Sequence, residues 1–380
     1  MSLRMERIEM REIRLPLREP FRISSGEVRH RRILLVETFA DDGTSGWSEC
    51  VAGEWPNYSP ETIDTAWLAI RSWLGPRLVG RVLDSPEAVR PLLDRDLRGH
   101  RMAKAALEMG VWELWSRREG VALSTLLGGT RDLVDVGISL GIQSSPDALV
   151  DRARTAVAQG YRKVKLKIAP GADYEYVAAV REAVGPSVEL MADANSAYHL
   201  ADADSLARLD ALDLMMIEQP LEPEDLVRHA RLQARLRTPI CLDESITSPE
   251  RAEDMIALGS GRIINIKPGR VGGFAASRAI HDLCAENGVP VWCGGMLESG
   301  VGRAHNVALA SLPNFTLPGD LSPSARYWER DIVLPEWTME ADGRVRVPRG
   351  RPGMGVEVDL DRVDDLTLRR EQIGAAGVLA

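Results

Sequence analysis

The fold is decided between residues 162 and 269, where five short apolar runs recur: RKVKLKI (162–168), VELMADAN (188–195), LDLMMIEQP (212–220), PICLDES (239–245) and IINIKPG (263–269). Each run has the length of a β-strand, and the amphipathic stretches between the runs are long enough for α-helices. Strands that alternate with helices in this way are typical of a parallel sheet with crossover helices. The region therefore predicts a repeated β/α architecture.

The same alternation continues on both sides of this region. Helices should begin at Ser145 and Ser248, because Ser is a favoured N-cap and a Pro follows each at the first helical position. Eight strands at this spacing favour a closed α/β barrel over an open doubly wound sheet, although spacing alone leaves the open sheet as an alternative. The three further strand candidates are VDVGISLGI (134–142), VPVWCGG (289–295) and NFTLPGD (314–320).

The flanking regions show another pattern. Two strand-like runs occupy the first 50 residues, and helix-like segments follow them, which is an α+β pattern. After Asp320 strand-like pieces return, and they fit the N-terminal part better than an extension of the barrel. We expect a capping domain at 1–130, a barrel at 131–322 and a C-terminal segment at 323–380 that returns to the capping domain.

The composition excludes several classes of protein. The chain has 380 residues, of which 44% are hydrophobic and 27% charged, as in ordinary soluble globular proteins. No stretch has the length and apolarity of a membrane span or a signal peptide, so we expect a cytoplasmic protein without a membrane partner. The net charge of −9 argues against nucleic-acid binding. The four cysteines show no zinc-binding spacing, and we expect them to be reduced and buried.

Five charged residues stand at the carboxyl ends of successive predicted strands. They are spaced 24 to 26 residues apart, which is one β/α unit. Active sites of α/β barrels form at this end of the strands, so residues one unit apart converge on one pocket. The five residues are Lys167, Asp193, Glu218, Asp243 and Lys267.

The three carboxylates predict a metal site. A single Asp or Glu at a strand end is more often a helix cap or a surface ion pair, but three at one period would repel one another unless a divalent cation joined them. Oxygen ligands suit Mg²⁺ better than zinc, and Mn²⁺ stays an alternative. The predicted ligands are Asp193, Glu218 and Asp243.

The lysines predict proton chemistry at a carbon beside a carboxylate. Lys165 and Lys167 lie two apart and share one face of a strand, while Lys267 lies four strands further around. Removing the proton creates an enediolate, whose charge a metal ion and Lys165 can stabilise. A neutral lysine, with its pKa lowered by neighbouring cations, can take the proton. Lys163 shares the same period, and no role is assigned to it.

These motifs resemble the enolase superfamily in its muconate-lactonizing subgroup. That subgroup carries a KxK motif at strand two, here Lys165-Leu166-Lys167, and a lysine at strand six, here Lys267. The mandelate racemase subgroup instead has a His on strand seven, whereas here strand seven is VPVWCGG and His305 follows in the next helix. The resemblance covers nearly the whole chain and implies a (β/α)7β modified TIM barrel with an α+β capping domain built from both termini.

Within the subgroup, the chain is similar to o-succinylbenzoate synthases that also racemise N-succinyl amino acids. The resemblance implies a carbon–oxygen lyase of menaquinone biosynthesis, an N-acylamino acid racemase, or both, acting on a small carboxylate with Mg²⁺ and working as a homo-oligomer. It rests on GYRKVKLKI, DANSAY, IEQPLE, TPICLDES, NIKPGRVGG, PVWCGGMLESG and LPNFTLPGDLSPS.

Other functions remain as alternatives. The chain could be a racemase with vestigial or absent synthase activity, or another cycloisomerase of the subgroup. Dipeptide epimerases would be expected to show Asp-x-Asp at the end of strand eight, and Asp320-Leu321-Ser322 weakens that alternative. A non-catalytic barrel would have lost a charged partner, and none is missing from the sequence.

The resemblance also implies roles for individual residues. In the dehydration Lys167 would remove the proton and assist hydroxide loss, while Lys267 stays a cation; in racemisation both would act as bases on opposite faces. Specificity loops should come from the capping domain, around residues 21–27 and 54–59. Arg270 resembles an arginine of the racemase branch, although an ordinary loop role is the alternative. The further substrate-binding or supporting residues are Ser139, Asn195, Glu244, Arg270, Gly295 and Met296.

Overall fold

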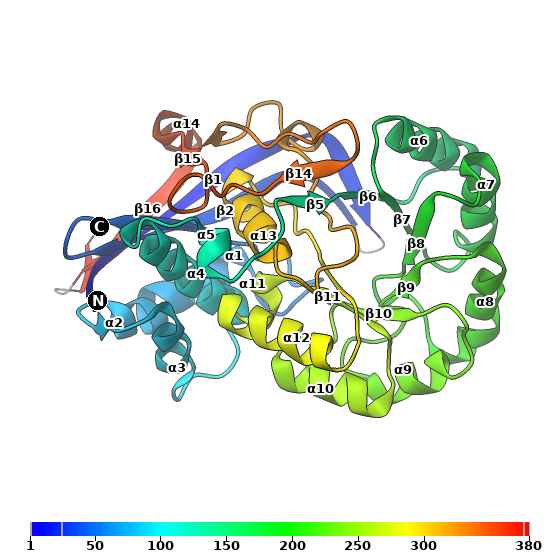
Figure 1. Cartoon of the computed structure of the whole chain (residues 1–380), viewed down its shortest axis with the longest axis horizontal. Coiled ribbons are helices and arrows are strands. Elements are labelled where there is room, and N and C mark those ends of the chain that lie inside the picture. The colour runs from blue at the N-terminus through cyan, green and yellow to red at the C-terminus, as the bar shows by residue number, and fades with distance from the viewer. Residues whose placement is uncertain (1, 24–25, 375–376, 380) are drawn as a thin grey trace.

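A computed structural model describes residues 2–23, 26–374 and 377–379 of the chain. Figure 1 shows two parts side by side: a sheet with helices that carries both chain ends, and a barrel surrounded by helices. The predicted α+β capping domain and α/β barrel are therefore both present. In the described part of the chain, no helix has the length and apolar character needed to cross a bilayer.

The capping domain is built on an antiparallel sheet with the order β17-β16-β1-β2-β3. A long hairpin of β1 (Leu3–Ile23) and β2 (Gly26–Ala40) forms its centre. Strand β16 (Thr367–Gly374) pairs with β1, so the C-terminal segment returns to the N-terminal sheet. The other strands are β3 (Ser45–Cys50), β17 (Gly377–Leu379) and β4 (Val82–Leu83), which pairs with β1.

Helix α4 (Arg101–Arg118) packs across the sheet and is buried from Met102 to Ser116. The backbones of β3 and α4 approach each other closely at Gly46. A glycine is required there, because a Cβ at Gly46 would lie only 2.4 Å from the Gly110 carbonyl oxygen. The remaining helical segments of this part are α1 (Ile63–Ala69), η1 (Ile70–Leu74), α2 (Gly75–Leu78), η2 (Pro86–Ala88), α3 (Val89–Asp94) and α5 (Leu123–Leu126).

The barrel strands are parallel and follow the chain in order around the sheet, from β6 to β12. Side chains of Met191, Met216, Cys241, Ile263 and Trp292 pack together as a separate buried cluster contributed by these strands. The seven strands found in the described residues are β6 (Gly137–Leu140), β7 (Lys163–Lys167), β8 (Glu189–Asp193), β9 (Met216–Glu218), β10 (Ile240–Leu242), β11 (Ile263–Ile266) and β12 (Val291–Cys293).

The expected eighth strand over 314–320 is wrong as a continuous strand. This segment forms two isolated parallel bridges, Val291 with Phe315 and Val136 with Gly319, which connect the two edges of the barrel sheet. Pro318 lies between the bridges and has no N–H to donate, so a continuous ladder cannot form there. The segment still spans the gap between the first and seventh barrel strands.

The barrel helices begin as the sequence predicts. The Ser145 and Ser248 hydroxyls accept hydrogen bonds from the N–H groups of Ala148 and Arg251, at 3.2 and 3.4 Å. The helices are α6 (Pro146–Ala158), α7 (Tyr174–Val184), η3 (Leu200–Asp202), α8 (Ala203–Arg208), η4 (Leu209–Leu212), α9 (Leu226–Gln233), α10 (Pro249–Leu258), α11 (Pro268–Val271), α12 (Phe274–Glu286) and α13 (Gly300–Ala310).

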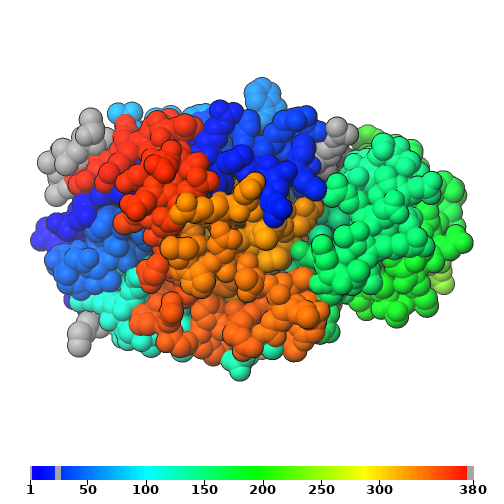
Figure 2. Space-filling view, turned by 90° about the horizontal axis from the view of Figure 1, so that it is seen from above, coloured from blue at the N-terminus to red at the C-terminus, as the bar shows by residue number. Residues whose placement is uncertain are grey.

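The C-terminal segment lies against both parts of the molecule. Seen from above, its orange portion borders the blue and red sheet on one side and the green barrel helices on the other (Figure 2). Its elements are η5 (Ser324–Arg326), β13 (Val333–Leu334) paired with β15 (Glu357–Val358), β14 (Arg344–Arg346) paired with β5 (Leu133–Asp135), and α14 (Leu360–Leu366).

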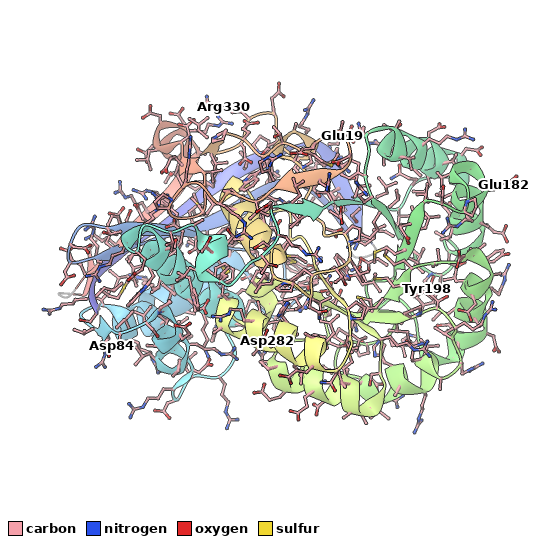
Figure 3. All side chains as sticks on the ribbon, in the orientation of Figure 1. Glu19, Asp84, Glu182, Tyr198, Asp282 and Arg330 are labelled. Carbon is pink, nitrogen blue, oxygen red and sulfur yellow. The ribbon has the colours of Figure 1, made fainter. Side chains whose placement is uncertain are left out.

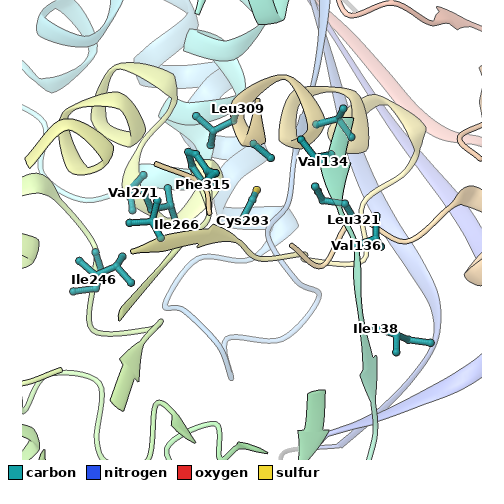
Figure 4. Close-up of a cluster of buried hydrophobic side chains, with 14 of the residues drawn as sticks. Val134, Val136, Ile138, Ile246, Ile266, Val271, Cys293, Leu309, Phe315 and Leu321 are labelled. Atoms are coloured by element: carbon teal, nitrogen blue, oxygen red, sulfur yellow. The ribbon is translucent and has the colours of Figure 1, made fainter. Parts of the chain in front are cut away.

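The largest hydrophobic core runs through the barrel and into the C-terminal segment. Figure 4 shows part of it, where Leu309 of α13 and Phe315 of the bridging segment pack near Cys293 at the end of β12. A second core lies between the capping sheet and its helices. All four cysteines are free and buried, as predicted.

Buried carboxylates from the capping domain hold the ends of barrel helices. Glu108 in α4 accepts hydrogen bonds from the N–H groups of Phe274 and Ala275, at 2.7 and 2.8 Å, at the start of α12. Glu49 in β3 does the same for Ser299 and Gly302 at the start of α13, both at 3.1 Å. Burial raises the pKa of Glu108 to about 7, although the backbone N–H groups favour its charged form. These contacts fix the cap on the barrel.

We predict that Glu108→Ala lowers the free energy of unfolding by about 1–3 kcal/mol, because it leaves buried N–H groups at Phe274 and Ala275 without acceptors. Glu87→Ala is the matched control. Glu87 also joins the cap to α12, through Arg278 at 3.4 Å, but its side chain is half exposed, so its loss should cost under about 0.5 kcal/mol. Chemical denaturation of both variants measures the difference, and equal losses would contradict the assignment.

Candidate active site

The carboxyl ends of neighbouring strands bring the predicted charged residues together. Lys167 pairs in register with Asp193, and Asp193 with Glu218, across the parallel strands β7, β8 and β9. Asp243 and Lys267 follow directly after β10 and β11. All five therefore stand at one mouth of the barrel, because parallel strands end on the same side.

Each ammonium group at this mouth contacts a carboxylate. Lys167 Nζ lies 2.6 Å from Asp193 Oδ2, and Lys267 Nζ lies 2.8 Å from Asp243 Oδ2. Lys165 Nζ lies 3.2 Å from Glu218 Oε2 and 3.4 Å from Asp193 Oδ2. The site is a buried set of alternating charges, since all of these side chains are at most 9% exposed.

The pKa values follow from burial and from these pairings. Burial and the nearby charge of Asp193 raise the pKa of Glu218. Burial would also raise the pKa of Asp193, but Lys167 and Lys165 hold it below its usual range. Burial would lower the pKa of Lys165, but Asp320, Glu218 and Asp193 raise it above its usual range. The contacts thus favour the charged forms of both Asp193 and Lys165.

Lys267 departs from the expectation of a lysine with a lowered pKa. Burial would lower its pKa, but Tyr58, Glu218 and Glu244 outweigh that effect and raise it. The physical reason is that the Tyr58 hydroxyl group, which comes from the cap, and the carboxylates of Glu218 and Glu244 all favour the charged form of this amine. With only the residues described here around it, this amine is held as a cation.

The donor chemistry of the three predicted ligands fits a hard divalent cation. Asp193, Glu218 and Asp243 are buried at 1%, 0% and 1% exposure and offer only oxygen atoms. Their arrangement, however, is that of ion pairs, and within the described part of the chain no three His, Cys, Asp or Glu side chains are grouped as a metal site. Lysine ammonium groups contact the oxygen atoms that a cation would use.

The residues predicted to support the site also lie around this mouth. Asn195 accepts from Lys167 Nζ at 2.6 Å and donates to Glu244 at 3.2 Å. Arg270 contacts Asp243 and donates to the Ile246 carbonyl at 2.7 Å. Ser139 lies beside Lys165 in the strand register. Gly295 and Met296 line the cavity described below.

The sequence patterns did not identify Tyr58 as an individual site residue. Its hydroxyl donates to Asp243 Oδ1 at 2.9 Å, and its ring lies 4.5 Å from Lys267 Nζ. It belongs to the expected specificity loop at 54–59, but it contacts a residue 185 positions away. Asn265, which donates to Glu218 at 2.7 Å, was also missed. Its position two residues before Lys267 on one strand was the available signal.

A cavity of about 490 Å³ opens between the cap and this mouth. The barrel side includes Lys167, Asn195 and Lys267, and the cap side includes residues 27–31 and parts of the loop around 53–61. Both expected specificity loops contribute, although residues 24 and 25 of the first lie outside the described residues. Toward the end of β1, Glu19, which is labelled in Figure 3, lies 2.6 Å from Arg152 of the barrel helix α6.

Known proteins share this architecture and sequence. Residues 6–128 match the mandelate racemase / muconate lactonizing enzyme N-terminal domain, and residues 148–363 match the enolase C-terminal domain-like family. An o-succinylbenzoate synthase from Geobacillus kaustophilus is 51% identical over 367 residues, covering 97% of each chain. An N-succinylamino acid racemase from Amycolatopsis sp is 47% identical over 373 residues, covering 98% of this chain and 100% of that protein.

A crystal structure gives the same result for the fold. An enolase-superfamily member from Listeria innocua superposes with a TM-score of 0.94 at 41% identity, covering 98% of this chain and 99% of that chain. The chain therefore belongs to the enolase superfamily. Within it, the chain belongs to the family of o-succinylbenzoate synthases and N-succinylamino acid racemases, which confirms the resemblance found in the sequence.

We predict that Gly294→Ala displaces the side chains behind Lys267. A Cβ at Gly294 would lie 2.3 Å from Asn265 Oδ1 and 2.6 Å from Lys267 Cε, and overpacking of this kind costs about 1–3 kcal/mol. Thermal unfolding and a crystal structure of the variant measure both effects. Gly350→Ala is the control, because a Cβ there meets nothing within 4 Å. A Gly294→Ala protein with wild-type stability and an unmoved Lys267 would contradict the packing described.

Proposed function

We propose that the chain removes the proton α to a substrate carboxylate through an enediolate, as an o-succinylbenzoate synthase with N-succinylamino acid racemase activity. One observation carries the proposal: Lys167 and Lys267 line the same cavity from strands on different sides of the barrel, with the carboxylates between them. A substrate in that cavity can meet one amine on each face. The names of the relatives at 47–51% identity agree with this chemistry.

The buried carboxylates support a metal ion as part of this proposal. Asp193, Glu218 and Asp243 would hold Mg²⁺, with Mn²⁺ as the alternative, because they are oxygen donors on adjacent strand ends. When bound, the ion supplies Lewis-acid stabilisation of the negative charge that forms on the substrate carboxylate. Carboxylates engaged in this way would no longer pair with the side-chain amines of Lys167 and Lys267, which contact Asp193 and Asp243 here. An amine freed from such a pair is available to act as a base.

Each of the three lysines would then have a separate role in the reaction. Lys167, oriented by Asn195, removes the α-proton, and in the dehydration it returns a proton to the leaving hydroxide. Lys165 remains charged and stabilises the enediolate. In the dehydration Lys267 stays a cation on the other face. In racemisation one of Lys167 and Lys267 takes the proton and the other delivers one, which inverts the carbon.

A contact of Asp320 argues against dipeptide epimerase activity. The expected Asp-x-Asp motif is incomplete here, because the residue two positions after Asp320 is Ser322, which is buried. Asp320 itself is engaged by the protein, since its Oδ2 lies 2.6 Å from Lys165 Nζ. Racemisation without dehydration remains the second candidate. A cytoplasmic location and a homo-oligomeric state stay predictions.

Paired assays test the proposed reactions. With Mg²⁺ in D₂O, an N-succinyl amino acid should exchange its α-proton, and the cyclohexadiene carboxylate should dehydrate to o-succinylbenzoate. A chelator should stop both reactions, and added Mg²⁺ should restore them. Exchange of the α-proton without dehydration would indicate a racemase that lacks synthase activity. The absence of both reactions would refute the proposal.

We predict that Lys167→Ala and Lys267→Ala each abolish both reactions, because each removes one proton-transfer group while the metal ligands stay. Unchanged thermal unfolding to within a few degrees would show that the fold survives. Lys104→Ala is the matched control: Lys104 is also a buried lysine in an ion pair, with Asp94 at 2.7 Å, but it lies in the cap helix α4. Near-normal turnover in either site variant would refute the assigned chemistry.

A further inference from the structure

Lys163 occupies a site built to hold a buried ammonium group beneath the active site. Its side chain is 0% exposed, and its Nζ lies 3.7 Å from the centre of the Trp292 ring. Gly137 is its partner in the strand register, and a Cβ there would lie 2.4 Å from Lys163 Cε. The missing side chain of Gly137 thus provides the space for the lysine. A buried charge of this kind is costly unless it has a partner.

Asp320 is that partner, and it lies between two lysines. Its Oδ1 lies 3.5 Å from Lys163 Nζ, and its Oδ2 lies 2.6 Å from Lys165 Nζ. Burial would raise the pKa of Asp320, but Lys165 and Lys163 outweigh burial and lower it. The backbone around Asp320 is also fixed, because its N–H donates to the Cys293 carbonyl at 2.9 Å and its own carbonyl accepts from Arg303. The carboxylate therefore has a defined place.

The chain contains few lysines, and most of them lie in the barrel. Only five of the 47 Lys and Arg residues are lysines: Lys104, Lys163, Lys165, Lys167 and Lys267. Four of these five lie in barrel strand β7 or directly after β11, and Lys163 is the first residue of β7. Arginine is a larger, planar group, and the space between Gly137 and Trp292 is fitted to a compact ammonium.

We propose that Asp320 positions Lys165 for enediolate stabilisation and that Lys163 is the buried counter-charge that supports Asp320. This inference rests on the proposed function. Lys165 contacts Asp193, Glu218 and Asp320. If Asp193 and Glu218 bind a metal ion, Asp320 is the contact that still holds the Lys165 ammonium in place. Burial lowers the pKa of Lys163, whereas the nearby Asp320 carboxylate favours its charged form. With Lys163 charged, the group of three has a net positive charge, so that Lys165 can still stabilise an anion.

The alternative is that Asp320 only neutralises Lys163 in the barrel interior. Two variants separate these roles. Lys163→Met removes the lower charge and keeps the Asp320–Lys165 contact, with Met filling the space over Trp292. The double variant Lys163→Met/Asp320→Asn also removes the carboxylate, so that one positive and one negative charge are lost together and the net buried charge equals that of the native protein.

Positioning predicts that the double variant turns over about 10- to 100-fold more slowly than Lys163→Met, with KM changed less than about threefold, as expected when a group that stabilises developing charge is misplaced. A purely neutralising Asp320 predicts equal turnover in the two variants, and that result would overturn the proposal. Asp320→Glu is a second test, since it keeps the charge and moves the carboxylate. Turnover of Asp320→Glu close to that of the native protein would also overturn it.

A readout independent of activity is the ¹⁵Nζ spectrum, which has only five lysine signals to assign. The Lys165 ammonium, identified by its loss in Lys165→Met, should exchange its protons slowly in Lys163→Met and faster in the double variant. An unchanged Lys165 signal in the double variant would overturn the proposal. If the native protein shows no proton exchange or dehydration, the proposed function fails, whereas this spectrum still reports whether Asp320 holds Lys165.

Discussion

The site depends on the mutual neutralisation of charges that are buried at the ends of parallel strands. Asp193, Glu218, Asp243 and Asp320 can be buried only because ammonium groups lie within about 3.5 Å of them. The strand register creates this arrangement, since it sets Lys167 beside Asp193 and Asp193 beside Glu218. The same balance makes the site responsive, because a divalent cation at the carboxylates would compete with the ammonium groups that contact them.

The capping domain completes the site in two ways. It covers the barrel mouth with a hairpin and a loop, and this loop brings Tyr58 to Asp243 and Lys267. It also fixes the barrel helices through the buried carboxylates Glu49 and Glu108, which accept from the first N–H groups of α13 and α12. The loop at Gly295 and Met296 leads directly into α13, so the cap helps to set the shape of the cavity.

Residues that follow the β/α period could be predicted from the sequence, and residues that meet across domains could not. The placement of Lys167, Asp193, Glu218, Asp243 and Lys267 at one mouth follows from equal spacing along a barrel. Tyr58 joins them through a contact between distant parts of the chain, which leaves no periodic signal. The expected strand at 314–320 failed because the pattern of apolar residues did not account for the missing N–H of Pro318.

Asp320 is a second residue whose contacts could not be predicted from the sequence. In the sequence it served only as half of an incomplete Asp-x-Asp pattern, and Lys163 had no role at all. The sequence shows no link between them, because Lys163 lies in the second barrel strand and Asp320 follows the seventh; the fold brings them to 3.5 Å. Lys163 lies opposite Gly137, and this pairing can be recognised only once the strand register is known.

The central claim is that the buried carboxylates form a cation site, and that a bound cation replaces their contacts with the lysine side chains. Titration of ¹⁵Nζ-lysine-labelled protein with Mg²⁺ tests this claim most directly. We predict a saturable change at Lys165, Lys167 and Lys267, while Lys104, paired with Asp94 in the cap, stays unchanged. The change should be lost in Glu218→Gln. The account would be contradicted if the lysine signals did not change with Mg²⁺, or if the Lys104 signal shifted as much as those of the site lysines.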